Sequence, residues 1–325
     1  MKIANNIQQE PFLWLDFKID NFQDFKALAQ VWSVDFLQLD GVPFYSELQQ
    51  MILPEVHVDH TNFNCHLDQK GKSPDDMWSF VIIGEDASMF KFNHETTQST
   101  STMVIYSPGS EINAVSYAGF EVYILSVTHE HLVQLTQSLG MDKIEEKLAT
   151  IDRVELDTLQ ASSLRNLLKD ILNNASSLKH KVITSEGKKL LLNFVPIKFL
   201  KEIGKQVGCA EKKLVQEKNM LFMEVRSYIH THLDEILNFE EIAKKFNITG
   251  RSLRNYFKEE LDTSPKQYLT ILRLTKVRDE LKVAKMEKGQ VESTARRFGF
   301  THMGQFAKSY KDFFGELPSE TLSKS

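Results

Sequence analysis

The last third of the chain contains an internal repeat, and this feature constrains the fold more than any other. Residues 239–265 align with residues 291–318 at an offset of 52, which becomes 53 after one added residue near the middle. The aligned pairs are Ala243 with Ala295, Phe246 with Phe298, Ile248 with Phe300, Thr249 with Thr301, Leu253 with Phe306, Phe257 with Tyr310, Leu261 with Phe314 and Pro265 with Pro318. A repeat of this kind indicates that one supersecondary unit occurs twice.

Each copy of the repeat is typical of two short helices joined by a tight turn. The turn begins at Asn247 in the first copy and at Gly299 in the second, the residue types that best tolerate a left-handed φ. Thr249 and Thr301 follow, where a hydroxyl group can cap the second helix. The pattern predicts a helix-turn-helix, whose second helix enters the major groove of DNA. Helical hairpins are common in protein cores, but two copies in one chain are much more specific.

A long helix is expected between the two copies. Ser264 precedes Pro265, which places a capping residue before a proline at the first helical position. The stretch 265–284 is then typical of an amphipathic helix, about 30 Å long at a rise of about 1.5 Å per residue. Successive major-groove faces lie about 34 Å apart along one side of B-DNA. Such a rod can therefore present two recognition helices to adjacent turns. At the start of the first copy, Asn238 and Glu241 predict a capping box.

Four polar residues in the first copy share one face of its second helix. Arg251, Arg254, Asn255 and Lys258 follow i, i+3, i+4, i+7 spacing, while Leu253, Phe257 and Leu261 fall on the opposite, core-forming face. Arginine pairs with guanine and asparagine with adenine, so the first three are candidates for base reading. Lys258, one turn further, is a candidate for a phosphate contact. We also place Thr249 and Thr301 at this interface. The alternative for each residue is a solvated side chain.

The second copy departs from this pattern. Its residues at the matching positions are Gly304, Ala307, Lys308 and Lys311, with Gln305 nearby. We therefore expect Gln305, Lys308 and Lys311 to grip the DNA backbone and respond to its shape rather than read many bases.

The distribution of charge agrees with a polyanionic partner. The net charge is −5, yet residues 220–325 hold 18 basic and 15 acidic side chains, a net +3. The remaining residues hold 21 basic and 29 acidic side chains, a net −8. A basic C-terminal third on an acidic body is a weak indication of nucleic-acid binding.

The first half of the chain has a different pattern. Short alternating segments such as 78–83 and 121–127 are separated by turn signals, for example 69–71 and 107–110, which favours a sandwich or a small barrel. Helical spacing follows from residue 131. We expect an α+β protein with three parts: an N-terminal domain over 1–205, a linker over 206–219 and an all-helical domain over 220–325. The predicted helices of the first domain lie at 131–151, 158–178 and 186–203.

The C-terminal region resembles the DNA-binding domain of the AraC/XylS family of transcription regulators. The residues that carry the resemblance are Ile242, Ala243, Leu253 to Phe257, Ser264, Pro265, Tyr268, Leu269, Arg273, Leu274, Arg278, Leu281, Ala295, Gly299, Phe300, Phe306, Tyr310, Phe313, Phe314, Gly315 and Pro318. The phrases 305–310 and 317–322 look closest to the ethanolamine-utilisation-regulator branch of the family.

This resemblance implies more than DNA binding. It implies that Arg273 and Gly299 are structural residues, with Arg273 tying the two helical subdomains together. It also implies a cupin-like effector barrel in the first half, with a helical dimerisation region between residues 131 and 208. The expected partners are double-stranded DNA, an unknown small-molecule effector, RNA polymerase and a second copy of the chain. We expect an activator that acts without a cofactor.

A small barrel lined by aromatic residues is a natural ligand pocket. Candidate lining residues, placed on the expected strands, are Trp78, Phe80, Phe92, Tyr106 and Tyr123, with Phe90 and Tyr117 as further aromatics. The alternative for each is a place in the hydrophobic core.

The segment 57–66 holds three histidines and one cysteine, His57, His60, Cys65 and His66. Their spacing does not fit a catalytic cupin, so we expect no metal site and no enzyme. The competing hypotheses are a metal-dependent cupin-type enzyme fused to a DNA anchor, and a helical scaffold whose repeat is coincidental. With two cysteines, no leader and no apolar run that could span a membrane, we expect a cytoplasmic protein without a membrane partner.

Overall fold

The computed structural model describes residues 9–29, 32–87, 89–93, 95–97, 99–141, 144–178, 182–206, 217–235 and 237–324. These residues divide into two compact units. The sheet unit takes in the described residues of 1–36, 44–64 and 69–213, and the helical unit those of 37–43, 65–68 and 214–325. The expected boundary over 206–219 lies largely outside the described residues. Helix α7 (Glu217–Thr231) begins within it.

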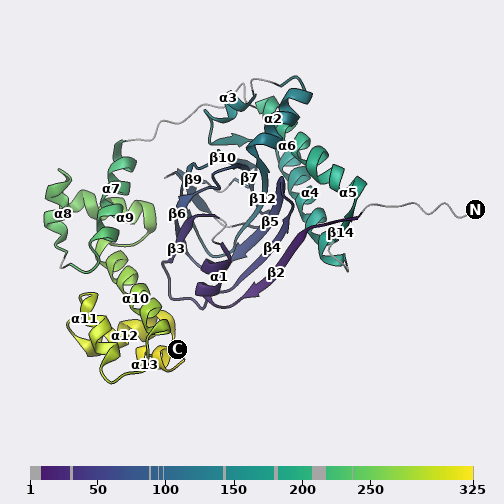
Figure 1. Ribbon diagram of the computed structural model, residues 1–325. Helices are drawn as coiled ribbons and strands as arrows, with labels where there is room; N and C mark the ends of the chain where they lie inside the picture. Colours follow the sequence, from purple (N-terminus) through teal and green to yellow (C-terminus); the bar gives the residue numbers. More distant parts are fainter. Residues whose placement is uncertain are drawn as a thin grey trace, which may run out of the picture. The chain divides into compact units, whose positions relative to one another are not determined.

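A seven-stranded antiparallel sheet forms the larger layer of the sheet unit (Figure 1). Its strands, in spatial order, are β13 (Arg153–Glu155), β10 (Thr102–Tyr106), β7 (Met77–Ile83), β12 (Phe120–Thr128), β5 (Val56–Phe63), β4 (Ser46–Ile52) and β2 (Leu13–Ile19). Strands β7 and β12 are buried along most of their length, and every residue of β7 is buried. Burial on both faces explains the continuous apolar run of residues 80–83.

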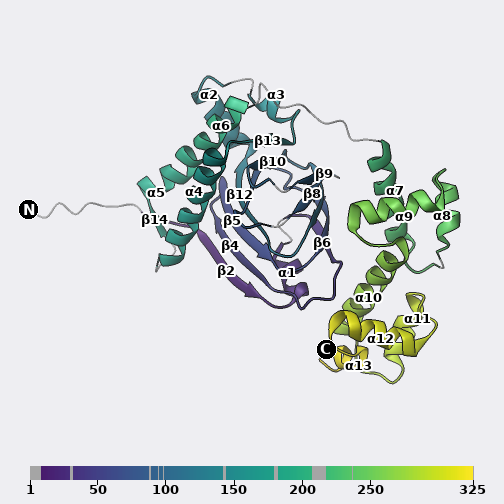
Figure 2. The same cartoon turned by 180° about the vertical axis from the view of Figure 1, so that it is seen from behind.

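A second sheet of five strands lies opposite the first (Figure 2). Its strands, in order, are β3 (Val34–Gln38), β6 (Leu67–Lys72), β11 (Glu111–Ser116), β8 (Phe90–Phe92) and β9 (Glu95–Thr97). A third, two-stranded sheet pairs β1 (Gln9–Pro11) with β14 (Val182–Thr184). In the described part of the chain the two larger sheets remain separate, so the expected cupin-like barrel is not closed.

Helix α1 (Phe22–Leu28) packs between the two larger sheets. Its residue Phe25 lies against Phe36 of the smaller sheet, with ring centroids 5.0 Å apart, and against Phe63 of the larger sheet, at 5.6 Å. Asn21 caps the helix by accepting a hydrogen bond from the backbone N–H of Gln23. Through Phe25 the helix thus contacts both larger sheets.

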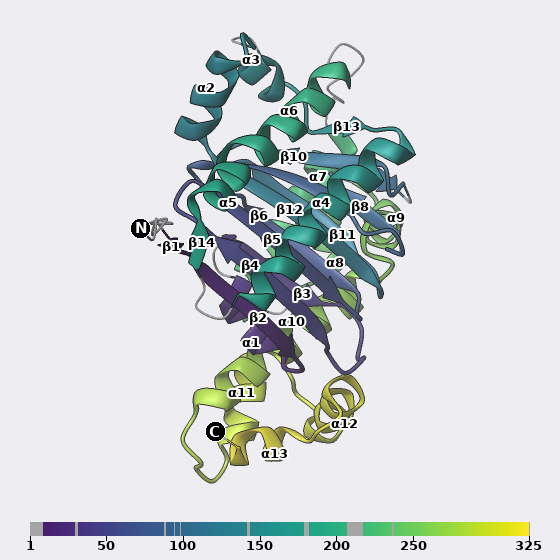
Figure 3. The ribbon, with the colours of Figure 1, turned by 90° about the vertical axis from the view of Figure 1, so that its right-hand side faces the viewer.

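Helices cover the outer face of the larger sheet (Figure 3). They are α2 (His129–Ser138), α3 (Ile144–Leu148), α4 (Thr158–Ser177), α5 (Ser185–Lys189), a π-helical turn η2 (Leu190–Phe194) and α6 (Val195–Gln206). Leu164, Leu168 and Leu172 of α4 join one core with Val58 and Leu125 of the sheet. The apolar stripe of α4 lies in the helical region that was expected to mediate dimerisation or to cover the barrel. It packs on the sheet.

Two sequence expectations in this unit are wrong in detail. The helix predicted over 131–151 is broken, because Gly140 has a φ of 64° and ends the first helical piece. The turn predicted at 69–71 lies inside strand β6. Gly71 is required there because a Cβ atom would stand 2.1 Å from the backbone oxygen of Ser33.

The helical unit contains two helix-turn-helix pairs joined by one long helix (Figure 2). Its helices are α7 (Glu217–Thr231), α8 (Phe239–Lys245), α9 (Gly250–Leu261), α10 (Pro265–Val283), α11 (Gln290–Arg297), α12 (Met303–Phe314) and α13 (Pro318–Ser323). Ser264 caps α10 and Pro265 occupies its first turn, as predicted. Among the described residues, no helix is long and apolar enough to cross a membrane.

Helix α10 serves two cores on different sides. Near its start Tyr268 packs on Phe257, with ring centroids 5.4 Å apart. Further along, Leu274, Val277 and Leu281 join the core of the second pair. At about 100° per residue these two sets lie on roughly opposite faces of the helix. The single amphipathic stripe predicted for α10 is therefore wrong, because each half buries its own face.

Candidate nucleic-acid interface and ligand cavity

The two helix-turn-helix pairs have the same turn. Asn247 and Gly299 adopt φ values of 54° and 79°, the left-handed conformation expected from their residue types. After the first turn, the N–H of Ile248 donates to the Ala243 oxygen at 2.9 Å. After the second, the N–H of Phe300 donates to the Ala295 oxygen at 3.1 Å. The repeat seen in the sequence is thus a repeat of backbone geometry.

The start of the second helix differs between the pairs. Thr249 is the N-cap of α9, and its hydroxyl accepts from the backbone N–H of Ser252 at 3.0 Å. In the second pair the N-cap is His302, which makes no side-chain cap bond. The expectation that Thr301 caps α12 is wrong, because the one-residue insertion shifts the cap position by one. Asn238 does cap α8, although Glu241 accepts from its side-chain amide rather than completing a capping box.

Helix α9 presents the predicted polar stripe to solvent. Arg251, Arg254, Asn255 and Lys258 are exposed, with 64% of the Arg254 side chain and 72% of the Lys258 side chain accessible. The opposite face is buried, and Phe257 and Leu261 are fully inaccessible. Arg254 lies 3.9 Å from Glu240, an exposed ion pair that contributes little. The guanidinium group is therefore available to a partner that approaches this face.

Helix α12 presents a different surface. Gln305, Lys308 and Lys311 are exposed, as is Gly304. Phe306 and Tyr310 fill the buried face, and the Tyr310 hydroxyl lies 2.8 Å from that of Thr321. Burial raises the pKa of Tyr310 to about 12. This helix offers two lysine ammonium groups, one amide and the carboxylate of Asp312, without a guanidinium group.

Arg273 of α10 connects the segment that follows α7 with the turn of the second pair. Its guanidinium donates to the carbonyl oxygens of Leu233, at 3.0 Å, and of Glu235. A Cβ atom at Gly299 would stand 2.8 Å from its Nη1 atom. One side chain therefore holds the end of the segment that follows α7 and packs against the turn of the second pair.

Arg278, further along α10, has a structural environment. It donates to Glu316 at 3.1 Å and lies 4.5 Å over the ring of Phe314. Glu316 also accepts from Thr321 and Lys324. Burial raises the pKa of Glu316, but these hydrogen bonds and the charge of Arg278 outweigh it and leave the pKa below its ordinary value.

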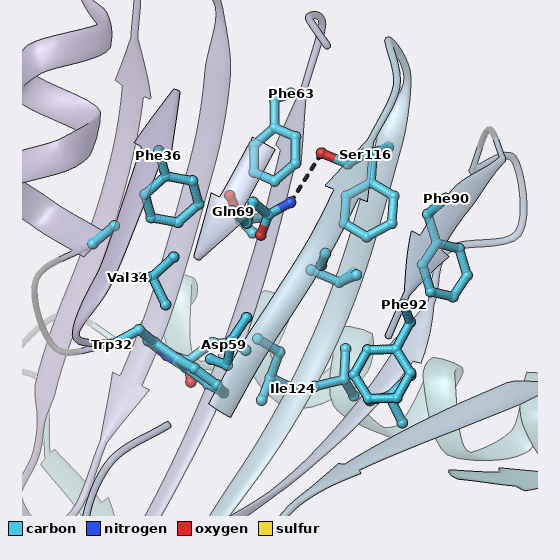
Figure 4. Close-up of a pocket in the computed structure, with 18 of the residues that line it drawn as sticks. Trp32, Val34, Phe36, Asp59, Phe63, Gln69, Phe90, Phe92, Ser116 and Ile124 are labelled. Carbon is cyan, nitrogen blue, oxygen red and sulfur yellow. Dashed lines mark hydrogen bonds between the residues drawn. The ribbon is translucent and has the colours of Figure 1, made fainter. Parts of the chain in front are cut away.

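The sheet unit encloses a cavity of about 120 Å³ between its two larger sheets (Figure 4). Of the aromatic residues expected to line it, Phe90, Phe92 and Tyr106 do so. Further aromatics that the sequence analysis did not single out complete the wall: Phe25, Trp32, Phe36, Phe63 and Phe120.

Four expected lining residues lie elsewhere, and one of them, Tyr117, has its ring 5.8 Å from the Nζ atom of Lys91. Trp78, Phe80 and Tyr123 belong to the core under the covering helices. Side chains alternate along a strand, so the cavity side of β7 carries Val81 and Ile83 instead. Both faces of β7 and β12 are apolar. The hydrophobic pattern therefore did not indicate which alternate set of side chains faces the cavity.

The polar residues of the cavity were also missed. Gln50, Asp59, Thr61, Gln69 and Ser116 line it. Gln50 donates to Asp59 at 2.8 Å. Gln69 donates to Ser116 at 3.0 Å (Figure 4). Burial raises the pKa of Asp59 to about 7, although the bond from Gln50 opposes the shift. The sequence offered one signal for these cavity residues, namely a polar residue within a strand of alternating pattern.

The histidines near residue 60 have separate surroundings. His60 Nε2 lies 2.9 Å from Glu121 Oε1, and its ring stacks on Tyr123 at 4.5 Å. Burial lowers the pKa of His57. Cys65 is a buried free thiol whose pKa burial raises. In the part of the chain that the structure describes, no three His, Cys, Asp or Glu side chains are grouped to hold a metal ion.

The geometry of the helical unit defines a tandem helix-turn-helix domain. A helix-turn-helix domain family matches residues 242–324. An XylDLEGF operon transcriptional activator of Pseudomonas putida is 33% identical over 107 residues, which cover 33% of this chain and 68% of that protein. The chain belongs to the AraC/XylS family of transcription regulators.

Other relatives match over segments of similar length. A longer XylDLEGF operon transcriptional activator of P. putida is 31% identical over 125 residues, 38% of each chain. A probable thc operon regulatory protein of Rhodococcus erythropolis is 37% identical over 95 residues, 29% of each chain. The chain thus spans about 38% or less of the length of these two relatives.

Two solved structures are similar in part. The AraC-like transcriptional activator CuxR is 18% identical and aligns over 82% of this chain and 96% of its own, with a TM-score of 0.46. A probable AraC family regulator from Rhodopseudomonas palustris is 27% identical over 32% of this chain and 96% of its own, with a TM-score of 0.30.

Proposed function

We propose that this protein is a sequence-specific DNA-binding transcription regulator, an activator controlled by a small molecule in the sheet unit. The observation that carries the proposal is the pair of helix-turn-helix units with one turn geometry, the first of which exposes Arg251, Arg254 and Asn255 on one face. Relatives named as operon transcriptional activators support the sign of regulation.

The two second helices would divide the work of binding. Helix α9 reads bases, because a guanidinium fork matches the O6 and N7 atoms of guanine and an amide matches adenine. Lys258 meets a phosphate. Helix α12 holds the backbone through Lys308 and Lys311, with Gln305 as its one candidate for base contact. Thr249 and Thr301, both exposed beside the helix starts, lie where phosphates approach.

Helix α10 sets the separation of the two readers. Its 19 residues give a length of about 28 Å. This is close to the separation of about 34 Å between successive major-groove faces. Arg273 and Gly299 maintain the arrangement through the contacts described above. One chain therefore covers about two turns of DNA.

The sheet unit would supply control. We propose a cupin-like effector domain over 1–205, a linker over 206–219 and a DNA-binding domain over 220–325, acting in the cytoplasm. Effector binding shifts the population of states that can engage DNA. A homodimer would form through the helices between residues 131 and 206, where Leu159 and Phe194 are 83% and 51% exposed. RNA polymerase is the proposed downstream partner.

The test is selection of bound sequences from a random DNA pool by the full-length protein. We expect an enriched motif that spans about two helical turns. Arg254→Ala should relax one position of that motif and lower specific affinity. Arg254→Lys is the matched control, because it keeps the charge and loses the fork, so the salt dependence should persist while the same position relaxes. Salt-dependent binding without any enriched motif would contradict sequence-specific reading.

A further inference from the structure

One ionisable carboxyl group lies inside a cavity whose lining is mainly apolar and aromatic. Asp59 is on β5, directly opposite Gln50 of β4, and only 5% of it is accessible. Gln50 donates to its Oδ1 atom. Thr61, two residues further along the same strand face, also lines the cavity. Its buried hydroxyl oxygen makes no hydrogen bond with the described residues.

No Lys, Arg or His side chain of the described part of the chain lines this cavity. Arg153, which does not line the cavity, lies 5.1 Å over the ring of Phe92 and pairs with Glu95 and Asp152. A buried carboxylate without a cationic partner is costly, because one hydrogen bond from an amide replaces little of its hydration. The cavity therefore has a place for a positive charge that the described residues lining it do not supply.

We propose that this cavity binds a small apolar amine, with the ammonium group on Asp59 and the hydrocarbon body among the aromatic side chains. The inference rests on the proposed function, since it names the class of effector that the sheet unit would sense. A volume of about 120 Å³ corresponds to a single ring with a short substituent.

The lining chemistry distinguishes this class from others. An ammonium group donates up to three hydrogen bonds, and Asp59 Oδ atoms and the Thr61 hydroxyl can accept them. Trp32, Phe36 and Phe92 can add cation–π attraction to the same charge. A carboxylate ligand would instead meet Asp59 with like charge and no cation. A neutral hydrocarbon would leave Asp59 unpaired.

The experiment compares three probes of similar size on the full-length protein. Benzylamine, benzyl alcohol and benzoate are titrated by calorimetry at about pH 8, where the Asp59 carboxyl is mostly ionised because its pKa is about 7. We expect benzylamine to bind about tenfold or more tightly than benzyl alcohol, the ratio typical of one charge-assisted hydrogen bond. Benzoate should not bind. Equal binding of all three, or a preference for benzoate, would overturn the inference.

Two variants show whether the preference comes from Asp59. Asp59→Asn keeps the shape and should reduce the benzylamine preference to about onefold. Glu121→Gln makes the same chemical change in the same sheet, at a residue that bonds to His60 and does not line the cavity, so the preference should be unchanged. Loss in both variants would assign the preference to net charge and contradict a cavity site.

DNA binding measured on the same samples separates the two proposals. A protein that selects a DNA motif but ignores benzylamine would refute the amine inference and leave the regulator proposal standing. A protein that prefers benzylamine but selects no motif would leave the cavity site and refute the regulator. If Asp59→Asn does not fold, Thr61→Val provides a second test, with an expected loss of several-fold in benzylamine affinity and none in that of toluene.

Discussion

In the first helix-turn-helix, formed by α8 and α9, the residue with positive φ is Asn247, and in the second, formed by α11 and α12, it is Gly299. The two turns share a hydrogen-bond pattern, and the last residues of both second helices are followed by a left-handed C-cap, Asp262 and Gly315. The surfaces differ, since α9 carries two arginines where α12 has glycine and alanine. Backbone geometry and surface chemistry have thus varied independently.

This difference suggests a division of roles. In the first copy a side chain caps the second helix, and this helix exposes guanidinium groups. In the second copy no side chain caps the second helix, and its exposed basic groups are lysine ammonium groups. The second copy also packs against Arg273 of α10 through its turn. We infer that the first copy determines which sequence is read and that the second adds affinity and holds the domain together.

The largest expected effect comes from the turn residues. Gly299→Ala should destabilise the helical unit by roughly 2–4 kcal/mol, because φ is positive and the new Cβ atom would displace the guanidinium of Arg273 from its carbonyl partners. Asn247→Ala should cost only about 1 kcal/mol, from φ alone. Urea unfolding followed by far-ultraviolet circular dichroism measures both.

The tryptophans of the chain provide an internal control for the comparison of the two turn variants. All three tryptophans, Trp14, Trp32 and Trp78, belong to the sheet unit, so their fluorescence reports its unfolding separately. Equal losses for the two variants would show that Arg273 contributes nothing to the difference between the turns.

The next effect concerns DNA recognition. Arg254→Ala should cost about 1–3 kcal/mol of specific binding free energy and relax one base position. Lys308→Ala should weaken binding evenly across sequences and reduce the salt slope by about 1. Fluorescence anisotropy with matched and scrambled sites at several salt concentrations separates the two. A sequence-dependent loss for Lys308→Ala would show that both helices read bases.

The caps give a smaller effect. Thr249→Ala should destabilise the helical unit by about 1 kcal/mol, since the N–H of Ser252 loses its acceptor. His302→Ser should stabilise it by up to about 1 kcal/mol, because His302 makes no cap bond at present. The same denaturation experiment applies. Destabilisation by His302→Ser would mean that the imidazole has a role beyond its cap position.

The smallest effect depends on pH. Contacts with Lys324, Thr321 and Arg278 keep the pKa of Glu316 low, while the aligned position in the first copy is Thr263. A carboxyl group whose pKa is depressed on folding stabilises the folded state above its unfolded pKa, near 4.5, and this contribution is lost as pH falls through the folded pKa. Glu316→Gln should therefore cost under about 1 kcal/mol at neutral pH and nothing in acid.

Hydrogen exchange of α12 and α13, compared with α8 and α9, locates that effect. Protection of the second pair should decrease in the variant at neutral pH and match the wild type below about pH 4. A constant gap at all pH values would show that Glu316 acts through packing rather than charge.

The helical unit was largely predictable from the sequence because its signals are local. Turn residues with left-handed φ, the capping residues Thr249 and Ser264, and the buried face of α9 depend on near neighbours along the chain. One missed detail was the cap at His302. It depends on where within the turn the inserted residue is accommodated, which alignment of residue types does not reveal.

The sheet unit was predictable only in outline. Which face of β7 and β12 lines the cavity depends on long-range packing, because both faces are apolar. Trp78 and Phe80 therefore lie in the core under the helices, whereas Val81 and Ile83 line the cavity. The pairing of Gln50 with Asp59 depends on strand register, which no local pattern specifies.

The length of helix α10 also sets the distance and the direction of α12 relative to α9, and both change by a fixed amount with each residue. Inserting one residue would turn α12 by about 100° around the helix axis relative to α9 and aim it away from the groove. An insertion of three or four residues would restore the direction of α12 but lengthen α10 by about 5 Å. This is more than one base-pair step of about 3.4 Å. Opposite faces of α10 are also committed to separate cores. On the proposed function, substitutions on α9 would therefore change which bases are read, while the spacing between the two recognition helices would stay nearly fixed.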